Sequence, residues 1–187
     1  ALGLFEAVGQ DKKVIEEKMK ALDDYLKYAV VNSDFSGQIL VADDNRIWID
    51  EGYGYADRSE QIEIDKKTVF DIGEVADQFT TTAILKLEEE GKLSVVDNIS
   101  KFFSWVPQDK ANITIHHLIT HTSGMPLQLG DDFEVVTRSE MIKKFMNTPL
   151  DFAPGEKFSY SKAGYNLLAA IIEIVSGEFY EEYIDKK

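Results

Sequence analysis

Residues 70–80 read Phe70-Asp71-Ile72-Gly73-Glu74-Val75-Ala76-Asp77-Gln78-Phe79-Thr80 and open the segment that decides the fold. From residue 74 to residue 90 the apolar residues have helical spacing, with Phe79, Ala83, Ile84 and Leu87 on one face. Gly91 is a suitable residue to end this helix, because glycine adopts a left-handed conformation without strain. The predicted helix therefore begins with two acids, Glu74 and Asp77, on one face of its first turn.

The segments around this helix predict a mixed α/β protein. Residues 11–29 carry apolar side chains spaced by three and four, which predicts an amphipathic helix. Residues 35–42 and 46–55 are rich in β-branched and aromatic side chains, and a turn-prone Asp-Asp-Asn at 43–45 separates them, so they predict a β-hairpin. Further helices are predicted at residues 115–120, 139–146, 163–176 and 178–187, of which 163–176 is the most apolar.

Composition limits the function classes. The chain has 187 residues, 44% of them hydrophobic, which is enough for a sizeable core. A net charge of -14 argues against binding to nucleic acid or anionic membrane surfaces. The absence of cysteine excludes disulfides, thiolate metal sites and cysteine nucleophiles. No apolar run reaches the roughly 18 residues of a membrane span, and no signal peptide is visible in residues 1–5.

Four collinear blocks carry a family resemblance: residues 35–56, 70–93, 113–124 and 154–168. The third block reads Ile-Thr-Ile-His-His-Leu-Ile-Thr-His-Thr-Ser-Gly, and the fourth begins Pro-Gly-Glu-Lys-Phe-Ser-Tyr-Ser. Together they resemble the serine β-lactamases and penicillin-binding proteins, which include class C β-lactamases, D-Ala-D-Ala carboxypeptidases and esterase relatives. Because the blocks follow one another over most of the chain, the resemblance is specific.

The resemblance implies an α/β (α+β) fold in which an antiparallel sheet is flanked by helices, with a helical subdomain and a cleft between the two. We expect residues 1–187 to form a single partial domain of this kind, with its C-terminal strands missing from this chain. Within it, residues 1–70 would form the N-terminal helix and hairpin, residues 71–160 the helical subdomain, and residues 161–187 a returning helix.

The resemblance also assigns the candidate site. The family's Ser-x-x-Lys motif supplies the nucleophile and a lysine, and a Tyr-x-Asn motif supplies a further proton-handling group. Here Glu74 stands at the serine position and Asp77 at the lysine position. Tyr160 matches the motif tyrosine, and Lys162 stands where asparagine is common. The third motif, Lys-Thr-Gly or His-x-Gly, does not follow Tyr160 within this chain.

Three interpretations of the two acids remain open. Acids favour helix N-termini, where each gains about 0.3–1 kcal/mol from the helix dipole, so both could be solvated. They could instead form a functional carboxylate site. The interpretation we favour is an exchanged ion pair between Asp77 and Lys162, with Tyr160 nearby, because a buried carboxylate without a partner is costly.

Two histidines could suggest a metal site. His117 and His121 are spaced i, i+4, which can place two imidazoles on one helix face. However, the glutamate that metalloproteases carry between such histidines is missing. We therefore expect packing and capping roles, with no metal and no cofactor.

Aromatic side chains offer a second kind of site. They could line a groove for a peptide or glycan, although core and hairpin packing is the commoner role of such residues. The residues concerned are Trp48, Tyr53, Tyr55, Phe102, Phe103 and Trp105.

The sequence leaves three functional hypotheses. The favoured one is a protein of this family that has lost serine acyl transfer and acts by binding or structure. The second is a serine hydrolase, such as a β-lactamase, D-Ala-D-Ala carboxypeptidase or esterase, with altered catalytic positions. The third is one half of a two-chain assembly. Expected partners are a peptidoglycan-like peptide or acyl ligand, or a second chain or copy pairing through an exposed sheet edge. By resemblance, the expected location is extracytoplasmic or at the cell envelope.

Overall fold

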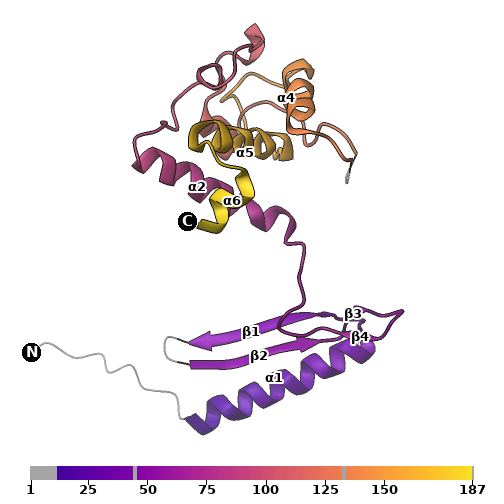
Figure 1. Ribbon diagram of the computed structural model, residues 1–187. Helices are drawn as coiled ribbons and strands as arrows, with labels where there is room; N and C mark the ends of the chain where they lie inside the picture. Colours follow the sequence, from indigo (N-terminus) through magenta and orange to yellow (C-terminus); the bar gives the residue numbers. More distant parts are fainter. Residues whose placement is uncertain (1–11, 44–45, 132–133, 187) are drawn as a thin grey trace, which may run out of the picture. The chain divides into compact units, whose positions relative to one another are not determined.

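The computed structural model describes residues 12–43, 46–131 and 134–186. Its helices and strands fall into two compact units, Ala1–Asp71 and Ile72–Lys187 (Figure 1). Each unit has its own hydrophobic core. We describe the two units in turn.

Unit 1 is a helix packed on a β-hairpin, as predicted. Helix α1 spans Lys12–Asn32, and the antiparallel strands β1 and β2 span Gly37–Asp43 and Arg46–Tyr53. Figure 1 shows α1 lying along the hairpin. A two-stranded hairpin is marginal alone, and here α1 covers one face with a core centred on Leu26, Ile49 and Tyr53. The predicted turn at 43–45 falls partly outside the described residues, at 44–45.

The predicted second strand proved too long. Strand β2 ends at Tyr53, and a separate strand β3, Tyr55–Asp57, pairs with β4, Ile62–Glu63. Gly54 between them has φ 76°, and a Cβ there would lie 2.5 Å from the Phe35 carbonyl oxygen. Only glycine tolerates this backbone conformation and approach. The alternating pattern on either side of Gly54 concealed this break.

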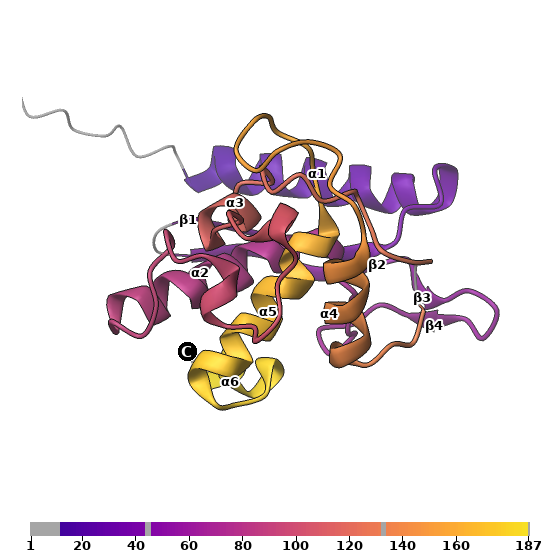
Figure 2. The same ribbon diagram turned by 90° about the horizontal axis from the view of Figure 1, so that it is seen from above.

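Unit 2 is helical. It contains α2 (Asp77–Glu89), α3 (Ile115–Ile119), α4 (Arg138–Asn147), α5 (Lys162–Ser176) and α6 (Tyr180–Lys186), with 3₁₀ turns at Gly73–Ala76, Ile99–Lys101 and Gln108–Lys110. These positions confirm the predicted helices. Helix α5 lies in the middle, in contact with α2, α3, α4 and α6 (Figure 2). The ends of α5 are defined by Ser161, whose side chain caps the N-terminus, and by Gly177 in the left-handed conformation.

The start of α2 differs from the prediction in a way that affects the site. The predicted helix began at Glu74, whereas Glu74 lies on the 3₁₀ turn and α2 begins at Asp77. The predicted end is confirmed, because Gly91 follows the helix with φ 70°. Ile84 and Leu87 are fully buried, so the apolar face of α2 is fixed against the core.

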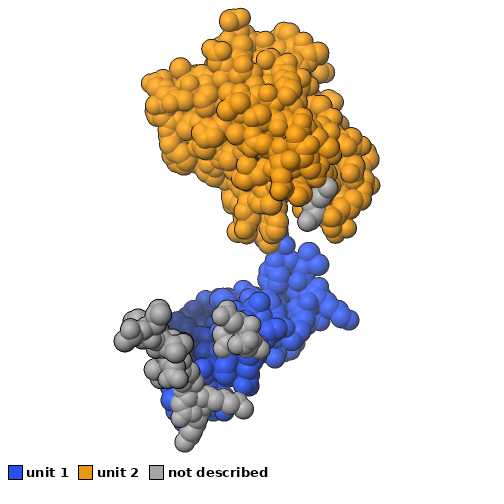
Figure 3. Space-filling model, turned by 90° about the vertical axis from the view of Figure 1, so that its left-hand side faces the viewer, with its two compact units in different colours: residues 1–71 blue, residues 72–187 orange. Residues whose placement is uncertain are grey.

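Figure 3 colours the two units separately, with the division between Asp71 and Ile72. The expectation of one partial domain, built from residues 1–70, 71–160 and 161–187, stays a prediction. None of the helices in the described part of the chain has the length and hydropathy needed to cross a membrane.

The packing of α5 generates the first testable prediction. Leu168 is fully buried in the unit 2 core, whereas Ile174, on the same helix, is 50% exposed. Leu168→Ala should lower the free energy of unfolding by about 2–5 kcal/mol, because it leaves a cavity. Ile174→Ala is the matched control and should change it by less than about 0.5 kcal/mol. Urea denaturation followed by circular dichroism measures both, and equal losses would contradict the assigned core.

Candidate functional site

The candidate site is built from three segments of unit 2. Glu74 lies on the 3₁₀ turn before α2, and Asp77 is the first residue of α2. Tyr160 precedes α5, Lys162 begins it, and His121 lies in the loop after α3. The start of α5 is held by the chain near residue 126. The Ser161 hydroxyl donates to the Pro126 carbonyl oxygen at 2.8 Å, and the Lys162 backbone N–H donates to the Leu127 carbonyl oxygen at 2.8 Å.

Lys162 forms an ion pair with Glu74, with 3.0 Å between Nζ and Oε1. The Glu74 side chain is 56% exposed and that of Lys162 is 38% exposed, so solvent screens the pair. The hydrogen bond from Lys162 lowers the pKa of Glu74. This corrects the predicted Asp77–Lys162 pair: the cation was right and the carboxylate was wrong. Sequence spacing could not decide between two acids three residues apart, because the 3₁₀ turn sets which one points toward Lys162.

Asp77 is instead hydrogen-bonded to Tyr160, whose hydroxyl donates to Asp77 Oδ2 at 3.2 Å. Asp77 is half-buried, and this burial raises the pKa of its carboxyl. The hydrogen bond from Tyr160 and the electrostatic interaction with His121 partly oppose that rise. Burial, followed by the charge of Asp77, raises the pKa of Tyr160 to about 12. Tyr160 is therefore protonated at neutral pH and acts as a donor.

His121 supports Tyr160 by packing. Its ring centroid lies 4.5 Å from that of Tyr160 and 5.1 Å from that of Tyr165. The backbone N–H of Ser161 donates to His121 Nδ1 at 3.3 Å. His121 itself has φ 55°, a left-handed conformation that is uncommon outside glycine. The ring thus positions the segment that carries Tyr160.

His117 caps α3, as predicted for this segment. Its backbone N–H donates to Thr114 Oγ1, and the Thr114 N–H donates to His117 Nδ1, each at 3.2 Å. Burial lowers the pKa of His117. Among the described residues, no group of three or more His, Asp or Glu side chains is arranged to hold a metal ion.

Several hydroxyl groups near the site have structural partners. Ser161 is buried and caps α5, and Thr80 shares a hydrogen bond with Tyr180 at 2.7 Å. Thr81 shares one of 3.0 Å with Tyr165, whose hydroxyl lies 3.1 Å from the Ile119 carbonyl oxygen. The sequence did not predict these links between α2, α5 and α6. The one signal of these links in the sequence is the run of three threonines from Thr80 to Thr82 inside a helix, where threonine is not favoured by propensity.

The two acids of the site have partners of different kinds. Glu74 is matched by a lysine, and Asp77 is matched by a phenol that stays protonated. A cavity of about 140 Å³ adjoins Lys162, and its other lining residues include Asn166 of α5 and Met141 of α4. The site can therefore offer hydrogen bonds and a charged rim to a ligand.

Comparison with known proteins gives consistent likenesses. Residues 16–187 match the protein family described as Beta-lactamase. Penicillin-binding protein 4* of Bacillus subtilis (strain 168) is 30% identical over 177 residues, which are 90% of this chain and 39% of that protein. The octameric penicillin-binding protein homologue from Pyrococcus abyssi is 32% identical with a TM-score of 0.75, covering 91% of this chain and 41% of that one.

FmtA from Staphylococcus aureus is 29% identical with a TM-score of 0.78, covering 95% of this chain and 48% of FmtA. The chain thus spans less than half the length of these three relatives.

The opposite pKa shifts of the two acids generate the second prediction. Because burial raises the pKa of Asp77 above its ordinary 3.8, its contribution to stability is fully present below that value and is lost as pH rises through the raised pKa. Asp77→Asn removes this loss of stability, because asparagine does not ionise, and its amide oxygen can still accept the hydrogen bond from Tyr160. The variant should therefore gain stability relative to the parent as pH rises from about 3 to about 7.

Glu74→Gln is the control, because its stability relative to the parent should change with pH in the opposite direction. The pKa of Glu74 is lowered, so its contribution is present above its ordinary 4.5 and is lost as pH falls through the lowered pKa. This variant should lose stability relative to the parent as pH rises. Urea unfolding across the pH range measures both. The same sign for the two variants would contradict the assigned environments.

Proposed function

This chain belongs to the beta-lactamase family, and on that premise we propose that it is a member that has lost serine acyl transfer and acts by binding a ligand. The proposal assigns Glu74 to the position of the family's nucleophilic serine and Asp77 to that of its lysine. The observation that carries it is the Glu74–Lys162 ion pair, 3.0 Å long, between the 3₁₀ turn before α2 and the first residue of α5.

Carboxylate chemistry supports the loss of acyl transfer. A carboxylate that attacked an acyl group would form an anhydride, which hydrolyses readily and does not accumulate. A serine nucleophile also needs a placed base. In this site Asp77 already accepts the bond from Tyr160, and Ser161 caps α5. Removing a nucleophile unit costs serine hydrolases roughly six orders of magnitude in turnover.

The ligand we propose is a peptidoglycan-like peptide or an acyl compound of the type the family takes. Tyr160 and Asp77 can bond the amide groups of such a ligand, and Lys162 can meet its carboxylate. The neighbouring cavity of about 140 Å³ offers room for a small side chain. The likeness to penicillin-binding proteins supports a location at the cell envelope as part of the same proposal.

A second candidate, one half of a two-chain assembly, is favoured by the sheet of unit 1. In the described part of the chain, β1 and β2 form a two-stranded sheet, so each has a neighbour on one side only. Strand β1 carries no charged residue before Asp43, and exposed uncharged edges readily pair with another strand. Analytical ultracentrifugation of the chain tests this candidate. A strictly monomeric chain at all concentrations would argue against self-association.

The third prediction tests the lost chemistry. The chain should neither hydrolyse nitrocefin nor retain penicillin covalently, because position 74 offers a carboxylate. Intact-protein mass spectrometry after incubation with benzylpenicillin should show the unmodified mass. An active penicillin-binding protein in the same assay is the control. A stable penicilloyl adduct on this chain would overturn the proposal.

The fourth prediction tests binding. Diacetyl-Lys-D-Ala-D-Ala should bind without being cleaved, and Tyr160→Phe should weaken it about five- to tenfold, as expected for one lost hydrogen bond. Tyr28→Phe is the matched control, because Tyr28 is an exposed tyrosine of α1. Titration followed by NMR measures both affinities. Equal affinities for the two variants would place the ligand elsewhere.

A further inference from the structure

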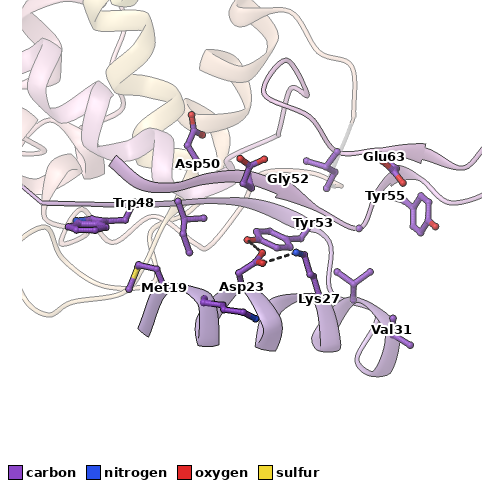
Figure 4. Close-up of a pocket in the computed structure, with 16 residues that line it drawn as sticks. Met19, Asp23, Lys27, Val31, Trp48, Asp50, Gly52, Tyr53, Tyr55 and Glu63 are labelled. Atoms are coloured by element: carbon purple, nitrogen blue, oxygen red, sulfur yellow. Dashed lines mark hydrogen bonds and ion pairs between the residues drawn. The ribbon is translucent and has the colours of Figure 1, made fainter. Parts of the chain in front are cut away.

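Unit 1 contains a groove of about 820 Å³ that is independent of the site above (Figure 4). One wall is a flank of α1, formed by Met19, Lys20, Asp23, Lys27, Val30 and Val31. Glu63 and Ile64 form part of the opposite wall, and residues 48–55 lie between. The α1 positions recur mainly at intervals of three and four, as expected for one side of a helix.

The strand residues show that the groove follows the edge of β2. Residues 48–53 line it consecutively. Successive side chains of a strand point to opposite faces, so a groove on one face would be lined by alternate residues only. Consecutive lining means that the groove includes side chains of both faces and the strand edge between them.

That edge is chemically suited to another strand. In the residues the structure describes, β2 pairs with β1 alone. On its other side, alternate residues therefore present their backbone N–H and C=O groups to the groove. The eight residues Arg46–Tyr53 extend over about 26 Å at about 3.3 Å per residue. The available edge of β2 ends at Gly54, because the Gly54 carbonyl oxygen already accepts a hydrogen bond from the Ile64 N–H at 3.1 Å.

The charge of the lining selects a cationic ligand. Four carboxylates line the groove, those of Asp23, Asp50, Glu51 and Glu63, against two lysines. Lys27 is held by Asp23 at 2.7 Å, and Lys20 by Asp24 at 2.6 Å. Within the described residues, no ion pair is found for Glu51 or Glu63, which are both exposed. These two carboxylates are therefore available to a ligand, and the net charge of -14 favours a cation at longer range.

Aromatic rings support the same choice. Figure 4 shows Trp48 toward one end of the groove and Tyr55 toward the other, with the Asp23 contacts to Tyr53 and Lys27 between them. The Arg46 guanidinium already lies 4.1 Å from the Trp48 ring centroid. The two rings therefore border the groove at its ends, and the Trp48 ring already stacks with a guanidinium of the chain itself.

We propose that this groove binds an extended peptide bearing arginine or lysine, which adds to the free edge of β2 as a further strand. Backbone hydrogen bonds to β2 supply the affinity, and Glu51 and Glu63 select basic side chains. The proposal concerns unit 1 alone, so its failure and the failure of the proposed function are separate results.

The test uses the whole chain and a capped peptide of sequence Thr-Arg-Val-Arg-Val-Arg-Thr. Binding should shift the backbone amide NMR signals of residues 47–53. Affinity is measured by titration at low ionic strength. The same peptide with alternate amides N-methylated should bind at least tenfold more weakly, because it cannot pair along β2. A peptide with glutamate in place of arginine should not bind measurably.

Two double variants that change the net charge equally distinguish binding in the groove from long-range electrostatic attraction to the whole protein. The double variant Glu51→Lys with Glu63→Lys should weaken binding of the arginine peptide at least tenfold. Glu17→Lys with Glu60→Lys, at exposed positions outside the groove lining, should weaken it less than about threefold. Equal losses in the two variants, or equal binding of the N-methylated peptide, would overturn the proposal. So would occupation of the β2 edge by a second copy of the chain in the absence of peptide.

Discussion

The burial of helix α5 is the constraint on which the rest of unit 2 depends. Seven residues of this helix are buried, and they lie on one broad face that takes up roughly half of its circumference: Ala163, Gly164, Leu167, Leu168, Ala170, Ile171 and Ile172. A helix with so broad a buried face needs more than one neighbour to cover it. Helices α2, α3, α4 and α6 provide that cover, and their packing brings the start of α2 to the start of α5. The candidate site is a consequence of this packing.

Once two acids stand at the start of α2, electrostatics decides the rest of the site. Glu74 is exposed enough for water to share in its solvation, and Lys162 adds a favourable contact. Asp77 is half-buried and cannot rely on water to the same extent, so the Tyr160 hydrogen bond matters more to it. Each acid therefore has a partner, which is an opposite charge for Glu74 and a neutral hydrogen-bond donor for Asp77.

Unit 1 is stabilised differently, because its hydrophobic core is small. The hairpin is stabilised by one face of α1, and Tyr53 links the two elements with its buried ring and with its hydroxyl, which donates to Asp23 at 2.9 Å. Burial and this bond raise the pKa of Tyr53 to about 12, so the donor is kept at neutral pH. Both residues of this link, Tyr53 and Asp23, also line the groove. The same tyrosine therefore belongs both to the core and to the lining of the groove.

The sequence by itself determined the local elements and the family. Apolar spacing predicted the helices and the hairpin, and collinear motifs predicted the fold class and singled out Glu74, Asp77, Tyr160 and Lys162. These features depend on neighbours along the chain, which the sequence displays directly. Tertiary structure decided three other things: which acid pairs with Lys162, the strand break at Gly54, and the groove lined by α1 and β2. Each depends on the approach of distant segments within a few ångströms, and no periodic pattern along the chain encodes that distance.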